Sequence, residues 1–134
     1  MENEVYLIGN NKNEILLTVT ISSTGFVVTD VLLSINGQNL LKGHSTDGTG
    51  FIGKAKIGNA ENLNYGLIVI ETDILLNKIP KEEWDECFDN LKIKYYFEGG
   101  KSGQTQPYLL KDNEKHADNS GSIIIAKKYI TLKI

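Results

Sequence analysis

The sequence predicts an all-β protein, an antiparallel β-sandwich of about 8–9 strands with one short helix. Short apolar runs alternate with period two, and Gly, Asn, Ser and Asp interrupt them roughly every 8–12 residues. Ile15, Leu17 and Val19 illustrate the alternation, because successive side chains of a strand point to opposite faces. A small closed β-barrel would show the same pattern and is the alternative architecture.

The first half of the chain predicts five strands joined by turns. The dipeptide Asn36-Gly37 is a strong hairpin signal, since both residues tolerate positive φ in a type I′ turn. The Gly-rich residues 43–50 are interpreted as a flexible loop, and Gly53 as the site of a β-bulge. The expected strands span residues 5–8, 14–21, 26–35, 38–42 and 51–57, the last with Phe51, Ala55 and Ile57 on one face.

The middle of the chain predicts a central strand and then a helix. Residues 66–73 are apolar on both faces across 67–70, so this strand is expected to be covered on both sides. The period then changes over residues 80–91, where proline and acidic residues in the first turn favour a helix start. We expect this helix to plug one end of the sandwich or to cover an edge. Its apolar stripe has helical spacing and consists of Trp84, Cys87, Phe88 and Leu91.

The remaining pattern predicts three strands and a long polar loop. Residues 93–97 alternate cleanly, whereas residues 106–111 contain a proline and are expected at a sheet edge. Residues 112–121 are interpreted as a loop. Residues 123–134 are expected to form a paired strand, and the whole chain 1–134 a single β-sandwich domain. The face of the last strand that is expected to be buried carries Ile124, Ala126, Ile130, Leu132 and Ile134.

Composition narrows the classes of function and partner. All 14 basic residues are lysine and the net charge is −3, which argues against nucleic-acid binding and against phosphoryl transfer by an arginine clamp. The single cysteine excludes an intrachain disulfide and suits a reducing compartment. The sequence shows no signal-peptide pattern and no apolar run near the ~20 residues that span a bilayer. We therefore expect no membrane insertion and a cytoplasmic location, with signal-independent export left open.

Two loops carry residue types that could support catalysis or metal binding. His44, Ser45 and Asp47 could resemble a nucleophilic triad, but such triads are assembled from distant segments on rigid elements. Asp112, Glu114, His116 and Asp118 alternate along the second loop. An EF-hand would need glycine at Ala117 and glutamate at Ile123. We expect no catalytic residue, cofactor or metal, and whether residues 112–121 hold an ion stays open.

Aromatic and acidic residues offer weaker signals. Trp84 and Tyr95 are expected in the core, and Cys87 is interpreted as a small buried hydrophobe. Tyr96 lies on the opposite face and is expected to be the exposed aromatic. The acidic residues around Glu82 and Glu83 are expected on a solvated helix face that could bind a basic partner.

The function that these observations favour is a non-enzymatic structural or interaction module. It would act as a subunit, adaptor or inhibitor in a protein assembly, through another protein or through self-association. The alternative is a β-sandwich that binds a carbohydrate or an apolar molecule, near Tyr96 or at residues 43–50 and 99–105. The candidate ligand or partner contacts are His44, Asp47, Tyr96, Glu82 and Glu83.

Overall fold

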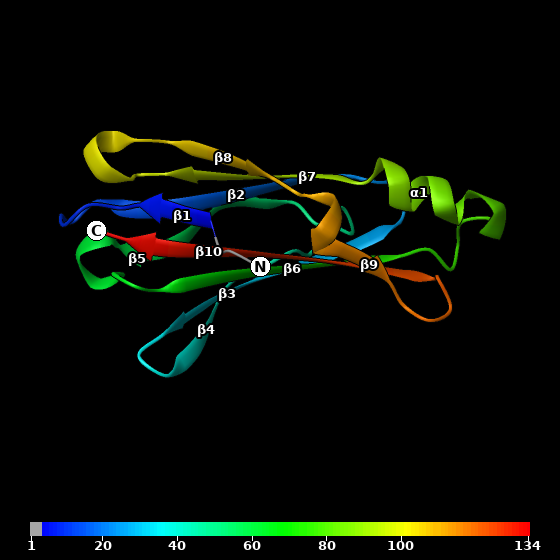
Figure 1. Cartoon of the computed structure of the whole chain (residues 1–134), viewed down its shortest axis with the longest axis horizontal. Coiled ribbons are helices and arrows are strands. Elements are labelled where there is room, and N and C mark those ends of the chain that lie inside the picture. The colour runs from blue at the N-terminus through cyan, green and yellow to red at the C-terminus, as the bar shows by residue number, and fades with distance from the viewer. Residues whose placement is uncertain (1–3) are drawn as a thin grey trace.

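The computed structural model describes residues 4–134 and confirms the predicted all-β sandwich. Two sheets form the layers, and neither closes into a barrel (Figure 1). Sheet A has the strand order β1-β10-β6-β3-β4, with β9 also paired to β10, and sheet B has the order β5-β2-β7-β8. All pairs are antiparallel except β1 with β10.

The described residues contain ten strands and one α-helix. Sheet A consists of β1 (Glu4–Leu7), β3 (Phe26–Ile35), β4 (Gln38–His44), β6 (Leu67–Leu75), β9 (Lys115–Ala117) and β10 (Ile123–Lys133). Sheet B consists of β2 (Glu14–Ser22), β5 (Ile52–Asn59), β7 (Lys92–Glu98) and β8 (Gln106–Leu109). The helix is α1 (Trp84–Asn90), and 3-10 turns lie at η1 (Ala60–Asn62), η2 (Lys81–Glu83), η3 (Lys101–Gly103) and η4 (Asp112–Glu114).

The core lies between the two sheets and follows the predicted alternation. Ile15, Leu17 and Val19 of β2 are fully buried, as are the inward residues of β6 and β10. Helix α1 lies at one end of the sandwich (Figure 1), and its Trp84 packs against the core. No helix among the described residues is long and apolar enough to cross a bilayer.

Three element boundaries differ from the sequence prediction. Strand β4 continues through His44, because Gly43 and His44 pair with β3. Strand β9 lies inside the predicted loop 112–121 and pairs with β10. The predicted helix 80–91 is divided into a 3-10 turn and the seven-residue α1.

The side-chain assignment of β5 was wrong at one end. Phe51 precedes the strand and is about half exposed, whereas Ile52 is buried. Lys54 has positive φ, and the pairing with β2 slips by one residue there. The slip confirms a bulge beside Gly53, and a bulge moves every preceding side chain to the other face. Ile134 was also assigned to the core but follows β10 and is exposed.

Strand β6 is central in sheet A, as predicted, but only one of its faces is covered. Ile68, Ile70 and Ile74 are fully buried between the sheets. The outward-facing Leu67 and Val69 are only half-buried, and Figure 1 shows no further layer on that side of sheet A. The prediction of a strand covered on both sides therefore fails within the described chain, and an outer apolar face results.

Candidate interaction surface

Strand β4 ends sheet A and projects beyond sheet B. The turn before it has the predicted type I′ character, with φ of 52° at Asn36 and 74° at Gly37. Residues 38–41 are all exposed, and only the later part of the strand packs near β5. Figure 1 shows the β3–β4 hairpin extending away from the other layer. No strand among residues 4–134 pairs with the outer edge of β4.

The other strands at the sheet edges carry features that discourage pairing with another chain. Strand β5 is bulged in two places, and β8 contains Pro107. Strand β9 has three residues, and in β1 the Val5 carbonyl accepts a hydrogen bond from Tyr108 Oη at 2.8 Å. Strand β4 also has a bulge, at the charged Lys42, but residues 38–41 before it contain no charge and no proline. The available edge of the described chain is therefore the first half of β4.

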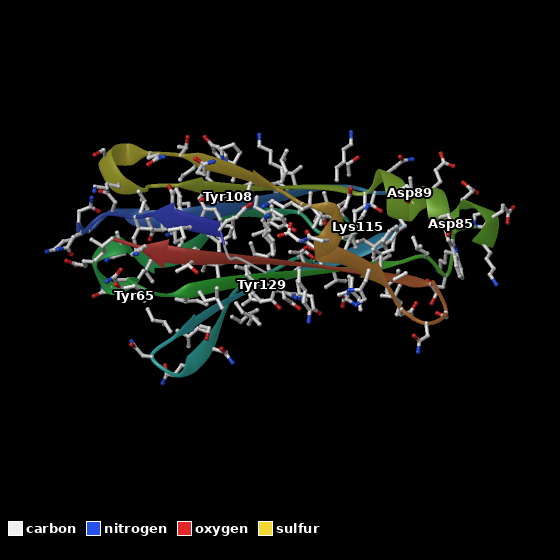
Figure 2. The ribbon with its side chains drawn as sticks, in the orientation of Figure 1. Tyr65, Asp85, Asp89, Tyr108, Lys115 and Tyr129 are labelled. Atoms are coloured by element: carbon white, nitrogen blue, oxygen red, sulfur yellow. The ribbon has the colours of Figure 1, made fainter. Side chains whose placement is uncertain are left out.

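An apolar row runs across the outer face of sheet A to this edge. Pairing registers place Tyr129 beside Val69, Val69 beside Leu32, and Leu32 beside Leu41. The first three are half-buried, and Leu41 is 61% exposed. Figure 2 shows Tyr129 on the side of sheet A that faces away from sheet B. The row ends at an unpaired strand, where a partner could cover both backbone and side chains.

A charged row lies beside the apolar row. It contains Lys127, Glu71, Asp30 and His44, which are neighbours on successive strands. His44 Nδ1 lies 2.5 Å from Asp30 Oδ1, and Lys127 Nζ lies 3.5 Å from Glu71 Oε1. At each end of the row a basic side chain thus lies beside a carboxylate. In its middle the carboxylates of Glu71 and Asp30 are neighbours.

Asp73 adds a third carboxylate on the same face, two residues beyond Glu71 along β6. Its Oδ1 is buried and has no hydrogen-bond partner within residues 4–134. Burial, followed by the negative charges of Glu71 and Asp30, raises the pKa of Asp73. A carboxyl group whose pKa is raised by folding destabilises the folded state when it is ionised.

We therefore expect Asp73→Asn to stabilise the protein at pH 7, by about 0.2–1 kcal/mol for a half-exposed charge. The gain should shrink as the pH falls through the raised pKa, and should vanish below the unfolded value near ~4, where the wild type is also protonated. Urea denaturation of wild type and variant at pH 7 and at a pH below ~4 measures the difference in free energy of unfolding. Asp85→Asn on α1 is the control, and an equal gain at both pH values would contradict the electrostatic explanation.

The residues of the predicted loop cluster point to different places. His44 belongs to the charged row. Ser45 is buried, and its Oγ accepts a hydrogen bond from Thr29 N at 2.8 Å. Asp47 caps a turn, because its Oδ1 accepts bonds from Thr49 N and Oγ1, which lower the pKa of its carboxyl. The structure therefore pairs His44 with Asp30 and turns Ser45 to the buried side. His44 and Asp47 line one surface hollow, but no hydrogen bond joins their side chains.

The other candidate contacts are dispersed over the surface. Tyr96, expected to be the exposed aromatic, is half-buried on the outer face of sheet B, with Lys94 Nζ 5.5 Å from its ring centroid. The most exposed tyrosine is instead Tyr65, at 70%. Glu82 and Glu83 are exposed on η2, next to α1. Cys87 is half-buried, and its Sγ lies 3.2 Å from Thr24 Oγ1. Tyr96, Glu82 and Glu83 therefore do not form one site with His44.

The alternating residues of loop 112–121 also separate. Glu114 turns inward, His116 pairs with Ile125 across the strands, and Asp118 accepts bonds from Ser120 Oγ and Ile123 N. Within residues 4–134, no group of three or more His, Cys, Asp or Glu side chains is arranged to hold a metal ion.

A buried charge cluster closes the opposite edge of sheet A. Lys128 is fully buried between the stretches of β10 that pair with β9 and β1. Its Nζ donates to Leu109 O at 3.0 Å and to Glu114 Oε1 at 3.0 Å, and lies 3.2 Å from Glu4 Oε2. Lys111 Nζ lies 2.7 Å from Glu4 Oε1.

This cluster was not predicted from the sequence, although one signal was present. Lys128 occupies an inward position of β10, midway between Ala126 and Ile130, where the alternation calls for an apolar side chain. Burial raises the pKa of Glu4, but hydrogen bonds and charges from Lys111 and Lys128 outweigh it and leave that pKa lowered. The ring of Tyr95 lies beside this cluster, with its centroid 6.0 Å from Lys128 Nζ. The buried hydroxyl of Tyr95 has no hydrogen-bond partner among the described residues.

The chain matches no known family model, and neither a curated protein nor a solved structure shows significant similarity to it.

Proposed function

We propose that this protein is a non-enzymatic interaction module that binds a partner protein by strand addition at β4. An extended segment of the partner would continue sheet A beyond Gln38–Leu41 through main-chain hydrogen bonds. Its outward side chains would extend the apolar row that ends at Leu41. The partner is either another protein or a second copy of this chain.

The observation that carries this proposal is the contrast between β4 and the other edges. Proteins normally protect an edge strand with charge, proline, bulges or brevity. Strands β1, β5, β8 and β9 carry such features or a covering side chain. In β4 the bulge and the charge lie at Lys42, and residues 38–41 before it carry neither. The adjoining apolar row gives the edge a hydrophobic contact that a chance strand end would lack.

The chemistry of the exposed polar groups also supports a binding role. His44 has a carboxylate partner in Asp30, but the nearest hydroxyl in the chain sequence, that of Ser45, is occupied by Thr29 on the buried side. The Ser45 hydroxyl is therefore not placed to act as a nucleophile that His44 activates.

We expect Leu41→Lys to abolish partner binding, because a charge on the edge would have to be desolvated against the incoming strand. Leu109→Lys is the matched control, since Leu109 is 65% exposed on the edge strand β8. Size-exclusion chromatography with light scattering tests self-association, and cross-linking in native lysate followed by purification tests a complex with another protein. Hydrogen exchange then measures protection of the amides of residues 38–42 in the complex.

Loss of the complex in the Leu41→Lys protein alone, together with slowed exchange in β4, would support the proposal. A complex that forms equally well with Leu41→Lys would contradict it. A protein that stays monomeric at all concentrations and yields no cross-linked complex would also contradict it.

A further inference from the structure

A hollow of about 500 Å³ lies at the α1 end of the sandwich, where three loops meet. They are the turn between β2 and β3, the loop after β4, and the loop after β6. Phe26, Leu75 and Ile79 provide its apolar lining, and Asp47, Asn77 and Lys78 provide polar groups. An apolar lining with a few converging polar groups is typical of small-ligand sites.

Hydrogen bonds hold two of these loops in place. Val27 N donates to Gly48 O at 2.8 Å, which ties the loop after β4 to the start of β3. Trp84 Nε1 donates to Leu76 O at 3.0 Å and to Ile79 O at 2.9 Å, which fixes the loop after β6. A ligand would therefore meet a preformed site and would order little of the chain when it binds.

Phe26 is the main apolar surface of the hollow. Its ring lies against the Gly48 backbone, where an added Cβ would come within 2.8 Å of ring atom Cε2. The residue is nevertheless 57% exposed. A glycine at this position lets the loop support the ring while much of the ring stays open to a ligand.

The polar groups around the ring are available to a ligand. Asp47 uses Oδ1 for Thr49, and Oδ2 makes no hydrogen bond with another residue of the described chain. Asn77 and Lys78 are exposed, and their side chains likewise make no hydrogen bond or ion pair within residues 4–134. One carboxylate and one ammonium group cancel in charge, so the site favours a neutral ligand that both donates and accepts hydrogen bonds.

We propose that this hollow binds a neutral carbohydrate. The apolar C–H face of one sugar ring stacks on Phe26, and its hydroxyl groups bond to Asp47, Asn77 and Lys78. The site is separate from the β4 surface, because Phe26 and Leu32 are six residues apart on one strand, which corresponds to about 20 Å. Sugar binding at this hollow therefore does not depend on strand addition at β4.

The test is an NMR titration of the ¹⁵N-labelled protein with maltose, cellobiose, lactose, mannobiose and N,N′-diacetylchitobiose, each to on the order of 10 mM. We expect saturable shifts of the amides of Phe26, Gly48 and Asn77 with at least one disaccharide. Phe26→Ala should raise the Kd about tenfold, which corresponds to about 1.4 kcal/mol. Asn77→Ala provides a second variant, and thermal melting checks the fold of each.

Tyr65→Ala is the matched control, because Tyr65 is 70% exposed and lies at the opposite end of the sandwich from α1 (Figure 2). A Kd that rises about tenfold with Phe26→Ala but does not change with Tyr65→Ala would support the proposal. The absence of shifts with all five sugars would overturn it, as would a Kd that neither Phe26→Ala nor Asn77→Ala raises. Stronger shifts at the same amides with glycine or with the apolar probe anilinonaphthalene sulfonate would overturn the proposed ligand class.

Discussion

Lys128→Met should destabilise the protein by about 3–5 kcal/mol, the cost of removing one partner from a buried ion pair. Lys128 is 0% exposed and is the shared partner of Glu114, Glu4 and Leu109 O. Without its ammonium group, the inward-turned Glu114 would lose both hydrogen bonds from Lys128 and would keep the bond from Lys111 N. Urea denaturation at pH 7 measures the change, and a variant that fails to fold agrees with it.

Lys127→Met is the matched control for this experiment. Lys127 is the preceding residue on the same strand, but it is exposed on the outer face and forms only a surface ion pair with Glu71. Its substitution should cost less than about 1 kcal/mol. Similar losses for the two variants would contradict the burial argument.

Two further comparisons separate the charge from the packing of the lysine stem. Adding Glu114→Gln to Lys128→Met should recover part of the lost stability, because the unpaired charge is removed as well. The lowered pKa of Glu4 gives the cluster a stabilising effect that is present above the unfolded value and lost as the pH falls through the folded value. The difference between wild type and Lys128→Met should therefore narrow in acid.

Gly99→Ala should have a comparably large effect, for a steric reason. Gly99 has φ of 85°, and a Cβ there would lie 2.1 Å from the backbone oxygen of Glu14. That oxygen belongs to the first residue of β2, which pairs with Asn59 of β5, so its movement would disturb sheet B. We expect a loss of about 3 kcal/mol or more, since positive φ alone costs about 1–2 kcal/mol and the clash adds to it.

Gly103→Ala separates the two contributions to this loss. Gly103 has a similar φ of 77°, but nothing lies within 4 Å of the position that an added Cβ would take. Its substitution should cost only the backbone contribution, about 1–2 kcal/mol. Thermal and urea unfolding of both variants measure the difference, and equal losses would show that the close approach to Glu14 is relieved by local movement.

The candidate surface could be predicted only in part. The apolar residues Leu67 and Val69 were recognised as facing away from the inward residues of β6, but a second covering layer was expected there. Their exposure depends on whether another element of the chain crosses that face, which local periodicity does not encode. His44 was identified from its neighbours in sequence, whereas its actual partner, Asp30, comes from the adjacent strand.

The buried cluster around Lys128 and the hollow around Phe26 could not be predicted from the sequence either. Lys128 meets Glu4 and Glu114 because β1 pairs in parallel with the end of the chain and η4 folds back beside it. Phe26 and Asp47 line one hollow with Asn77 because three turns meet at one end of the sandwich. The spacing of residues within one segment does not predict contacts between segments that are distant in the sequence.

The sequence by itself determined the all-β class, the inward faces of most strands and the Asn36-Gly37 hairpin, because period-two burial and positive φ are local properties of the chain. Only the tertiary structure decided the strand order, the unprotected edge at β4, the burial of Lys128 and the assembly of the hollow around Phe26. These depend on which distant segments lie side by side, and many strand orders satisfy the same alternation of apolar and polar residues.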